Sequence, residues 1–231
     1  MKRFSSTLSR YGPLLLILAV AQTASADDLT PPTWRNTDPS WTVQEWGLYS
    51  PPGPPLAPDG NIWGSNGSGF VNPFGLPQMS ASGPISFYPF NIGRPGVYEL
   101  HNNLSTLDFD IPNDGGGVGS TKLIRAQIDW ISPGSSLHPN GSILANGQTF
   151  FAIGQFDIPS ANGWIHTTLD FQLPFCPNLE TFRLNSDFGH VFVDQVVIDT
   201  ICVPEPTTVA SIGLGLAALM RRRRGSRPTH A

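Results

Sequence analysis

Apolar and polar residues alternate with a period of two through the middle of this chain, and this alternation constrains its fold more than any other feature. In residues 121–131, one face holds Ile124, Ala126, Ile128 and Trp130, and Lys122 lies outside that face. In residues 164–173, a polar face that includes His166 lies opposite a mostly apolar one. Successive strand residues point to opposite faces, so the alternation predicts strands with one buried face. No segment of the middle shows a convincing helical period of 3.6.

Turn clusters separate the predicted strands. Gly, Asn and Pro favour the backbone angles at which a chain reverses, and they gather at residues 113–117, 132–135, 139–141, 146–147 and 162–163. Residues 144–148 predict a tight hairpin. Further strands are expected at residues 42–49, 85–90, 96–101, 105–111, 143–144, 148–153, 179–184 and 190–203. Many short strands with regular turns predict an all-β fold, an antiparallel jelly-roll-like β-sandwich.

The N-terminus has the pattern of a secretory signal peptide. A basic start with Lys2, Arg3 and Arg10 precedes an apolar run at residues 14–21 and small residues at 24–26. This arrangement predicts an N-terminal signal helix in residues 1–26, cleaved before Asp27. A buried helix or a retained anchor is the alternative, but the apolar run is short for a bilayer about 30 Å thick.

The C-terminus predicts a short transmembrane helix with a basic stop. Residues 207–220 are uncharged and would form a helix about 21 Å long, which is shorter than a stable span. Four arginines follow directly and favour the cytoplasmic side: Arg221, Arg222, Arg223 and Arg224. A tail anchor with a chance Pro-Glu-Pro motif is one interpretation of this segment.

The same tail resembles a PEP-CTERM sorting signal. The resemblance rests on Pro204, Glu205 and Pro206, the short apolar helix and the arginine cluster, all at the end of the chain. It implies recognition and processing by an exosortase-like membrane enzyme, transient membrane insertion of the helix, and export by a Gram-negative bacterium that makes exopolysaccharide. The expected organisation is a signal peptide at 1–26, a sandwich domain at 27–203 with a Pro/Gly-rich part at 27–69, and the sorting signal at 204–231.

Charge excludes several partners for the middle domain. The whole chain has a formal charge of -4, but residues 27–203 hold five Lys and Arg against 16 Asp and Glu, a formal charge of -11. Nucleic acid is not expected as a partner, because phosphate binding requires clustered basic residues. An anionic lipid surface is not expected for the same reason.

The two cysteines of the chain predict a disulfide. Cys176 and Cys202 would reach an oxidising compartment, where an isolated pair can join. The bond would close a loop and stabilise the fold by about 3 kcal/mol. Two unpaired thiols are the alternative.

Aromatic residues in the N-terminal part of the domain suggest a sugar-binding face. Flat rings take the apolar faces of sugars while nearby polar groups take hydroxyls, and the candidates are Trp34, Trp41, Trp63, Tyr49 and Tyr88. Packing of these rings onto the sandwich as a lid is the alternative. The stretch at residues 192–199 is also weakly similar to the last strand of galactose-binding-like and other carbohydrate-module sandwiches.

Calcium and catalytic groups are weaker candidates. Asp108, Asp110, Asn113 and Asp114 offer oxygen ligands for calcium near one turn. A polar turn with solvated carboxylates is the favoured alternative. Any of Glu45, Glu99 and Glu180 could pair with an aspartate as in a glycosidase. The four histidines of the domain show no metal-binding spacing, and His166 and His190 are expected to face solvent. No cofactor and no enzymatic activity are expected.

The sequence thus predicts an exported bacterial protein at the cell surface or in the extracellular matrix, after an inner-membrane intermediate. A non-catalytic structural or adhesive role is expected, sorted by the C-terminal signal. A carbohydrate-binding module attached to exopolysaccharide is the alternative, and a glycoside hydrolase is a more distant one.

Overall fold

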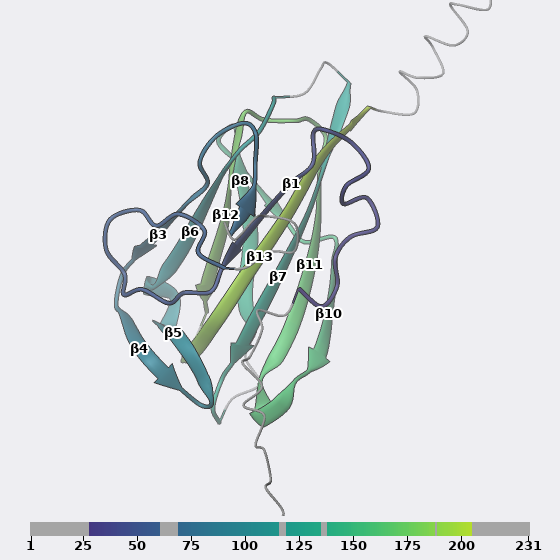
Figure 1. Cartoon of the computed structure of the whole chain (residues 1–231). Helices are drawn as coiled ribbons and strands as arrows, with labels where there is room; N and C mark the ends of the chain where they lie inside the picture. The colour runs from purple at the N-terminus through teal and green to yellow at the C-terminus, as the bar shows by residue number, and fades with distance from the viewer. Residues whose placement is uncertain (1–27, 61–68, 116–118, 135–137, 188, 205–231) are drawn as a thin grey trace, which may run out of the picture.

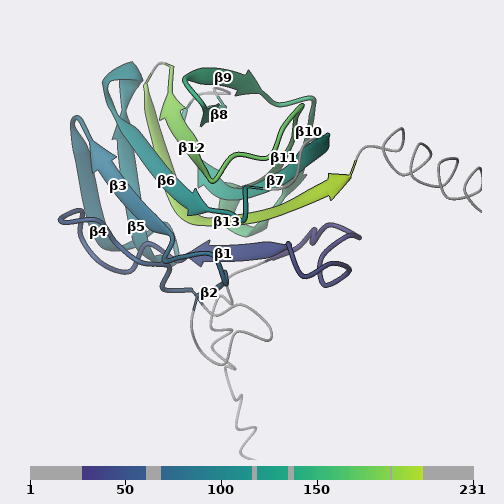
Figure 2. The same cartoon turned by 90° about the horizontal axis from the view of Figure 1, so that it is seen from above.

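Two antiparallel sheets packed face to face make up the folded domain (Figure 1; Figure 2). The structure is a computed structural model that describes residues 28–60, 69–115, 119–134, 138–187 and 189–204. Figure 2 looks along the strands and shows the smaller sheet, with β8, β9 and β12, across from the larger sheet, with β7, β11 and β13. The prediction of an all-β antiparallel sandwich is therefore confirmed.

The larger sheet has eight strands. Six of them follow the order β10 (Gly154–Pro159), β11 (Ile165–Leu173), β7 (Ser120–Ile131), β13 (His190–Pro204), β1 (Thr42–Trp46) and β2 (Phe70–Val71). The other two are β5 (Arg94–His101), which pairs with β13, and β4 (Ile85–Asn91), which pairs with β5.

The smaller sheet has five strands. Their order is β3 (Gln78–Ser82), β6 (Thr106–Pro112), β12 (Leu179–Ser186), β8 (Pro139–Ala145) and β9 (Gln148–Phe151). Two short 3₁₀ helices, η1 (Asn102–Leu104) and η2 (Ala161–Gly163), connect strands.

Strand β13 has a central place in the larger sheet, because two different strands pair with it along one edge and a third pairs with it along the other. On one side it pairs with β7 along almost its whole length. On the other side, residues 190–193 pair with β5 and residues 196–200 pair with β1. A register shift between Val193 and Gln195 marks a β-bulge at this change of partner. Bulges bend a strand and re-aim side chains, so this bulge lets one strand serve two neighbours.

The core lies between the two sheets and follows the alternation of the sequence. In β6, for example, Leu107, Phe109 and Ile111 are fully buried, and the residues between them are partly exposed. The ring of Phe109 contacts Trp46 of the larger sheet edge-on, with 4.9 Å between the ring centroids. Aromatic contacts of this kind add to the stabilisation that burial provides.

The outer face of the larger sheet is also largely buried, because residues of the N-terminal part lie on it. Arg35 donates hydrogen bonds to both carboxylate oxygens of Asp199 at 2.5 and 2.6 Å. Thr30 and Asp28 bond to Gln127 on β7. Asp199 and Gln127 are consequently 0% and 1% exposed. The polar face predicted from alternation is therefore a second packing layer rather than a solvated surface.

Several turn and strand predictions can be compared with the structure directly. The 144–148 hairpin is confirmed, with positive φ at Asn146 and Gly147 between β8 and β9. The turn predicted at residues 139–141 is wrong, because these residues belong to β8. Gly141 serves packing there: a Cβ would lie 2.4 Å from a side-chain carbon of Leu169. Strands β2, β3 and β10 were not predicted.

No helix among the described residues is long and apolar enough to span a membrane. The predicted signal helix at 1–26 and the predicted C-terminal helix at 207–220 both lie outside the described residues.

Candidate functional site

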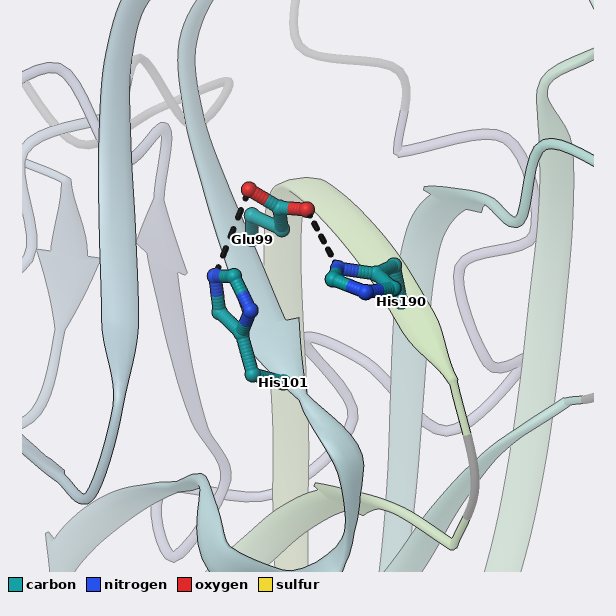
Figure 3. Close-up of side chains that lie close together, drawn as sticks. All are labelled: Glu99, His101 and His190. Atoms are coloured by element: carbon teal, nitrogen blue, oxygen red, sulfur yellow. Dashed lines mark hydrogen bonds and ion pairs between the residues drawn. The ribbon is translucent and has the colours of Figure 1, made fainter.

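Glu99, His101 and His190 form a cluster on the outer face of the larger sheet, near the end of β5 (Figure 3). One ligand-capable atom from each side chain lies within 4.8 Å of the other two. Nδ1 of His190 is 2.6 Å from Oε1 of Glu99, and Nε2 of His101 is 3.3 Å from Oε2. The histidine side chains are 28% and 58% exposed, whereas that of Glu99 is 8% exposed. The cluster is therefore a buried carboxylate beneath two solvent-accessible imidazoles.

Neighbouring side chains hold this cluster in position. The hydroxyl of Tyr88 donates a 2.7 Å hydrogen bond to Oε2 of Glu99. The hydroxyl of Ser86 lies 3.1 Å from Nε2 of His101. The two imidazole rings meet edge-on with 4.7 Å between their centroids. Each of the three central side chains thus has a defined orientation before any ligand arrives.

Strand register, rather than sequence spacing, creates this cluster. His190 pairs directly with His101 across β13 and β5, and Glu99 lies two residues before His101 on the same face. The two histidines lie far apart along the chain, so they show no spacing typical of metal ligands in the sequence. His190 faces solvent as predicted.

A second polar cluster is buried at the β-bulge of β13, where the pairing partner on one edge changes from β5 to β1. Nη1 of Arg94 donates to Asp129 at 2.6 Å and to Asp194 in the bulge at 2.7 Å. The other oxygen of Asp129 lies 2.6 Å from Nδ1 of His166, and the guanidinium stacks on Trp164. His166 is 1% exposed, so the prediction that it faces solvent is wrong. The cluster links β5, β7, β11 and the bulge of β13, and among its members Nε2 of His166 is buried without a hydrogen-bond partner.

A third polar cluster closes one end of the core. Lys122 and Glu180 are both fully buried and form an ion pair, and Asn113 bonds to both side chains. Burial raises the pKa of Glu180 to about 7, although Lys122 and Asn113 act in the opposite direction. Burial likewise lowers the pKa of Lys122. Lys122 was expected outside the buried face of β7, and this expectation is wrong because Glu180 of the opposite sheet accompanies it into the core.

The three glutamates considered for glycoside hydrolysis lie in three different environments. Glu45 is 1% exposed and accepts a hydrogen bond from Gln195. Glu99 belongs to the histidine cluster and Glu180 to the ion pair with Lys122. Two pockets of the described structure, with volumes of about 330 and 180 Å³, each have one carboxylate in their walls, Asp187 and Asp170 respectively.

The aromatic candidates for sugar stacking are spread over different parts of the sheet. Trp41 packs against Val43 and Val197 as a lid residue. Tyr88 bonds to Glu99, and Tyr49 is 47% exposed. Trp34 lines the smaller pocket with Arg125 and Asp170. Trp63 lies outside the described residues.

The proposed calcium ligands are not gathered around one point. Asp108 accepts two hydrogen bonds from Arg183, and Asp110 accepts one from Thr181. Asp114 is exposed in the turn that follows β6. In the described part of the chain, these residues belong to no cluster with metal-binding geometry. The carboxylates of Asp108 and Asp110 instead accept hydrogen bonds from side chains on β12.

Cys176 and Cys202 are joined by a disulfide, with 5.9 Å between their Cα atoms. The bond attaches the loop after β11 to the end of β13, two residues before Pro204. Pro204 is the last described residue, so Glu205, Pro206 and Arg221–Arg224 lie outside the described part. The tail therefore leaves the sandwich from a covalently fastened strand.

Comparison with known proteins identifies this tail. No curated protein matches the chain. Among solved structures, the chain is similar to one described as "Crystal structure of BuGH86E322Q in complex with neoagarooctaose", with 11% identity and a TM-score of 0.34 over 70% of this chain. The match spans only 28% of that protein's length. Residues 203–224 match the family model of the PEP-CTERM protein-sorting motif. The chain therefore carries the signal that an exosortase recognises, and this signal begins at the end of the last strand of the sandwich.

Proposed function

We propose that this protein is an exported bacterial surface or extracellular-matrix protein whose jelly-roll-like sandwich has a non-catalytic, structural or adhesive role. The observation that supports this proposal is the PEP-CTERM match at residues 203–224, which begins within the last two residues of β13. In the proposed route, the signal peptide directs export and the C-terminal helix holds the chain in the inner membrane. An exosortase then processes the tail, and the sandwich domain reaches the outside of the cell.

The separation of the three glutamates from one another supports the non-catalytic part. A glycosidase needs two carboxyl groups on opposite sides of a substrate cleft, about 5 to 10 Å apart. The three glutamates of the domain are instead buried in separate clusters and are held by Gln195, by histidines and by Lys122.

The sorting step is tested in a bacterial host that carries an exosortase. Replacing Pro204, Glu205 and Pro206 together by alanine should leave the chain unprocessed in the membrane fraction, while the unaltered chain reaches the surface in a shorter form. A matched control replaces Pro159, at the end of β10, by alanine. Equal processing of both variants would refute sorting through the motif, and mass spectrometry of the surface fraction provides the measurement.

One observation favours a carbohydrate-binding module as a second candidate. Trp34 shares a pocket of about 180 Å³ with Arg125 and Asp170, which combines a flat ring with charged hydrogen-bonding groups. Sugar sites use this combination of apolar surface and few polar groups. Saturable binding to a polysaccharide that is lost in Trp34→Ala and retained in Trp41→Phe would establish the module. Failure of the unaltered protein to bind any polysaccharide in a pull-down would leave the structural role.

A further inference from the structure

We propose that Glu99, His101 and His190 bind a divalent transition-metal ion, with Zn²⁺ as the best fit. The three side chains point toward one another from two neighbouring strands (Figure 3). Two imidazoles and one carboxylate are a ligand set that zinc uses in proteins, with a fourth position open to water. Calcium and magnesium fit poorly, because they prefer oxygen ligands throughout.

The three ligand atoms lie within 4.8 Å of one another, and one of the distances to Glu99 already matches this ion. Tetrahedral ligands at about 2.0–2.1 Å from zinc lie about 3.3 Å from one another. Nε2 of His101 already lies 3.3 Å from Oε2 of Glu99. Nδ1 of His190 lies 2.6 Å from Oε1, at hydrogen-bond distance. Binding would replace the proton of that hydrogen bond by the metal and separate the two atoms by about 0.7 Å more, which a small rotation of the exposed His190 side chain supplies.

The strands make the ligand arrangement rigid. His101 and His190 are direct cross-strand partners, and side chains in such pairs start from Cβ atoms about 5 Å apart. The backbone N–H of Asn102 bonds to the carbonyl of Gly189 at 2.8 Å beside this pair. Because the ligands stand on paired strands, little conformational entropy is lost when an ion binds.

A hydrogen bond to the carboxylate of Glu99 and the charge of the domain favour a cation here. Tyr88 donates to Glu99 and therefore fixes the orientation of its carboxylate, as outer partners of metal ligands commonly do. The two histidines are accessible to solvent, which gives the ion an entry path. The formal charge of -11 on residues 27–203 attracts cations to the surface.

Titration calorimetry with zinc chloride tests the site on the full-length chain, purified in detergent without a polyhistidine tag. One ion should bind per chain, and His101→Gln and His190→Gln should each weaken binding by about tenfold or more. His138→Gln is the matched control, because His138 is also an exposed histidine and lies 3.6 Å from a carboxylate oxygen of Asp157. It should bind zinc like the unaltered protein.

Two further measurements separate the site from general effects. Zinc should raise the thermal midpoint of the unaltered protein and of His138→Gln, and should not raise that of His101→Gln or His190→Gln. Calcium at the same concentration should have no effect. Binding weaker than millimolar, or equal binding by all three histidine variants, would overturn the proposal and leave the cluster as a hydrogen-bond network. Circular dichroism of the metal-free variants verifies that each one is folded.

Discussion

At the scale of single residues, the polar side chains of this domain are more often buried than the sequence pattern suggests. Lys122, Glu180, His166 and Asp199 are all at most 1% exposed. Buried ionisable groups are tolerated when partners satisfy them, and removing one partner is costly. Burial shifts the pKa values of Lys122, Glu180 and Asp199, so the titration of these three groups becomes part of the stability of the fold.

Glu180 should make the domain less stable as pH rises from about 4.5 to about 7. Its pKa is raised by burial from 4.5 to about 7, so in this window the unfolded chain has lost a proton that the folded chain retains. Glu180→Gln should remove this slope, because glutamine does not titrate. Urea denaturation at several pH values provides the measurement. Parallel stability profiles for the two proteins would contradict the expectation.

Gly96 should tolerate alanine far less well than Gly147. Both have positive φ, +69° and +74°, so alanine is strained at either position by about 1 kcal/mol. A Cβ at Gly96 would also lie 2.7 Å from the carbonyl oxygen of Leu48, whereas nothing lies within 4 Å at Gly147. Gly96→Ala should therefore lose at least about 2 kcal/mol more in the free energy of unfolding. Similar losses in both variants by chemical denaturation would refute the close approach.

At the scale of elements, the bulge in β13 determines how the larger sheet is divided. Residues before the bulge pair with β5 and residues after it pair with β1. Arg94, at the first position of β5, binds Asp194 in the bulge and Asp129 on β7. One guanidinium therefore links three strands where the backbone pairing changes.

Arg94→Ala should destabilise the domain by roughly 3 to 5 kcal/mol, because it removes the cation from two carboxylates that are nearly buried. Arg183→Ala is the matched control. Arg183 also forms two hydrogen bonds to a carboxylate, that of Asp108, but its side chain is 39% exposed, and exposed pairs contribute about 0 to 1 kcal/mol. Thermal and urea unfolding of both variants measure the difference. A loss below about 1 kcal/mol for Arg94→Ala would show that the link is dispensable.

At the scale of the whole molecule, the last strand of the sandwich overlaps the start of the sorting motif. β13 contacts β7, β5 and β1, and the PEP-CTERM match begins at its end. The disulfide at Cys202 fastens this end to the loop after β11. In the sorting route proposed above, a strand held in this way would give the sorting signal a fixed point of attachment to the domain.

Replacing Cys176 and Cys202 by serine should lower the free energy of unfolding by about 3 kcal/mol, because the bond restricts a loop of the unfolded chain. The sequence separation of the two cysteines is 26 residues. Hydrogen exchange should become faster at residues 201–204 beside the lost bond. It should also become faster at residues 124–130 in the centre of β7, because the most protected amides exchange through global unfolding. Unchanged exchange in both segments would contradict the expectation.

The all-β class, the tight hairpin at residues 146–147 and the sorting motif can be predicted from the sequence alone. These features depend on neighbours along the chain: alternation, positive φ at Asn and Gly, and a contiguous motif. Which polar faces are buried and which distant residues contact one another depends on the tertiary fold. His166 was assigned to solvent because alternation cannot show that other segments cover the outer face of a sheet. His101 and His190 are partners because the register of β5 and β13 aligns them. A turn fixes the register of a hairpin, but no turn joins these two strands, which lie far apart in the sequence.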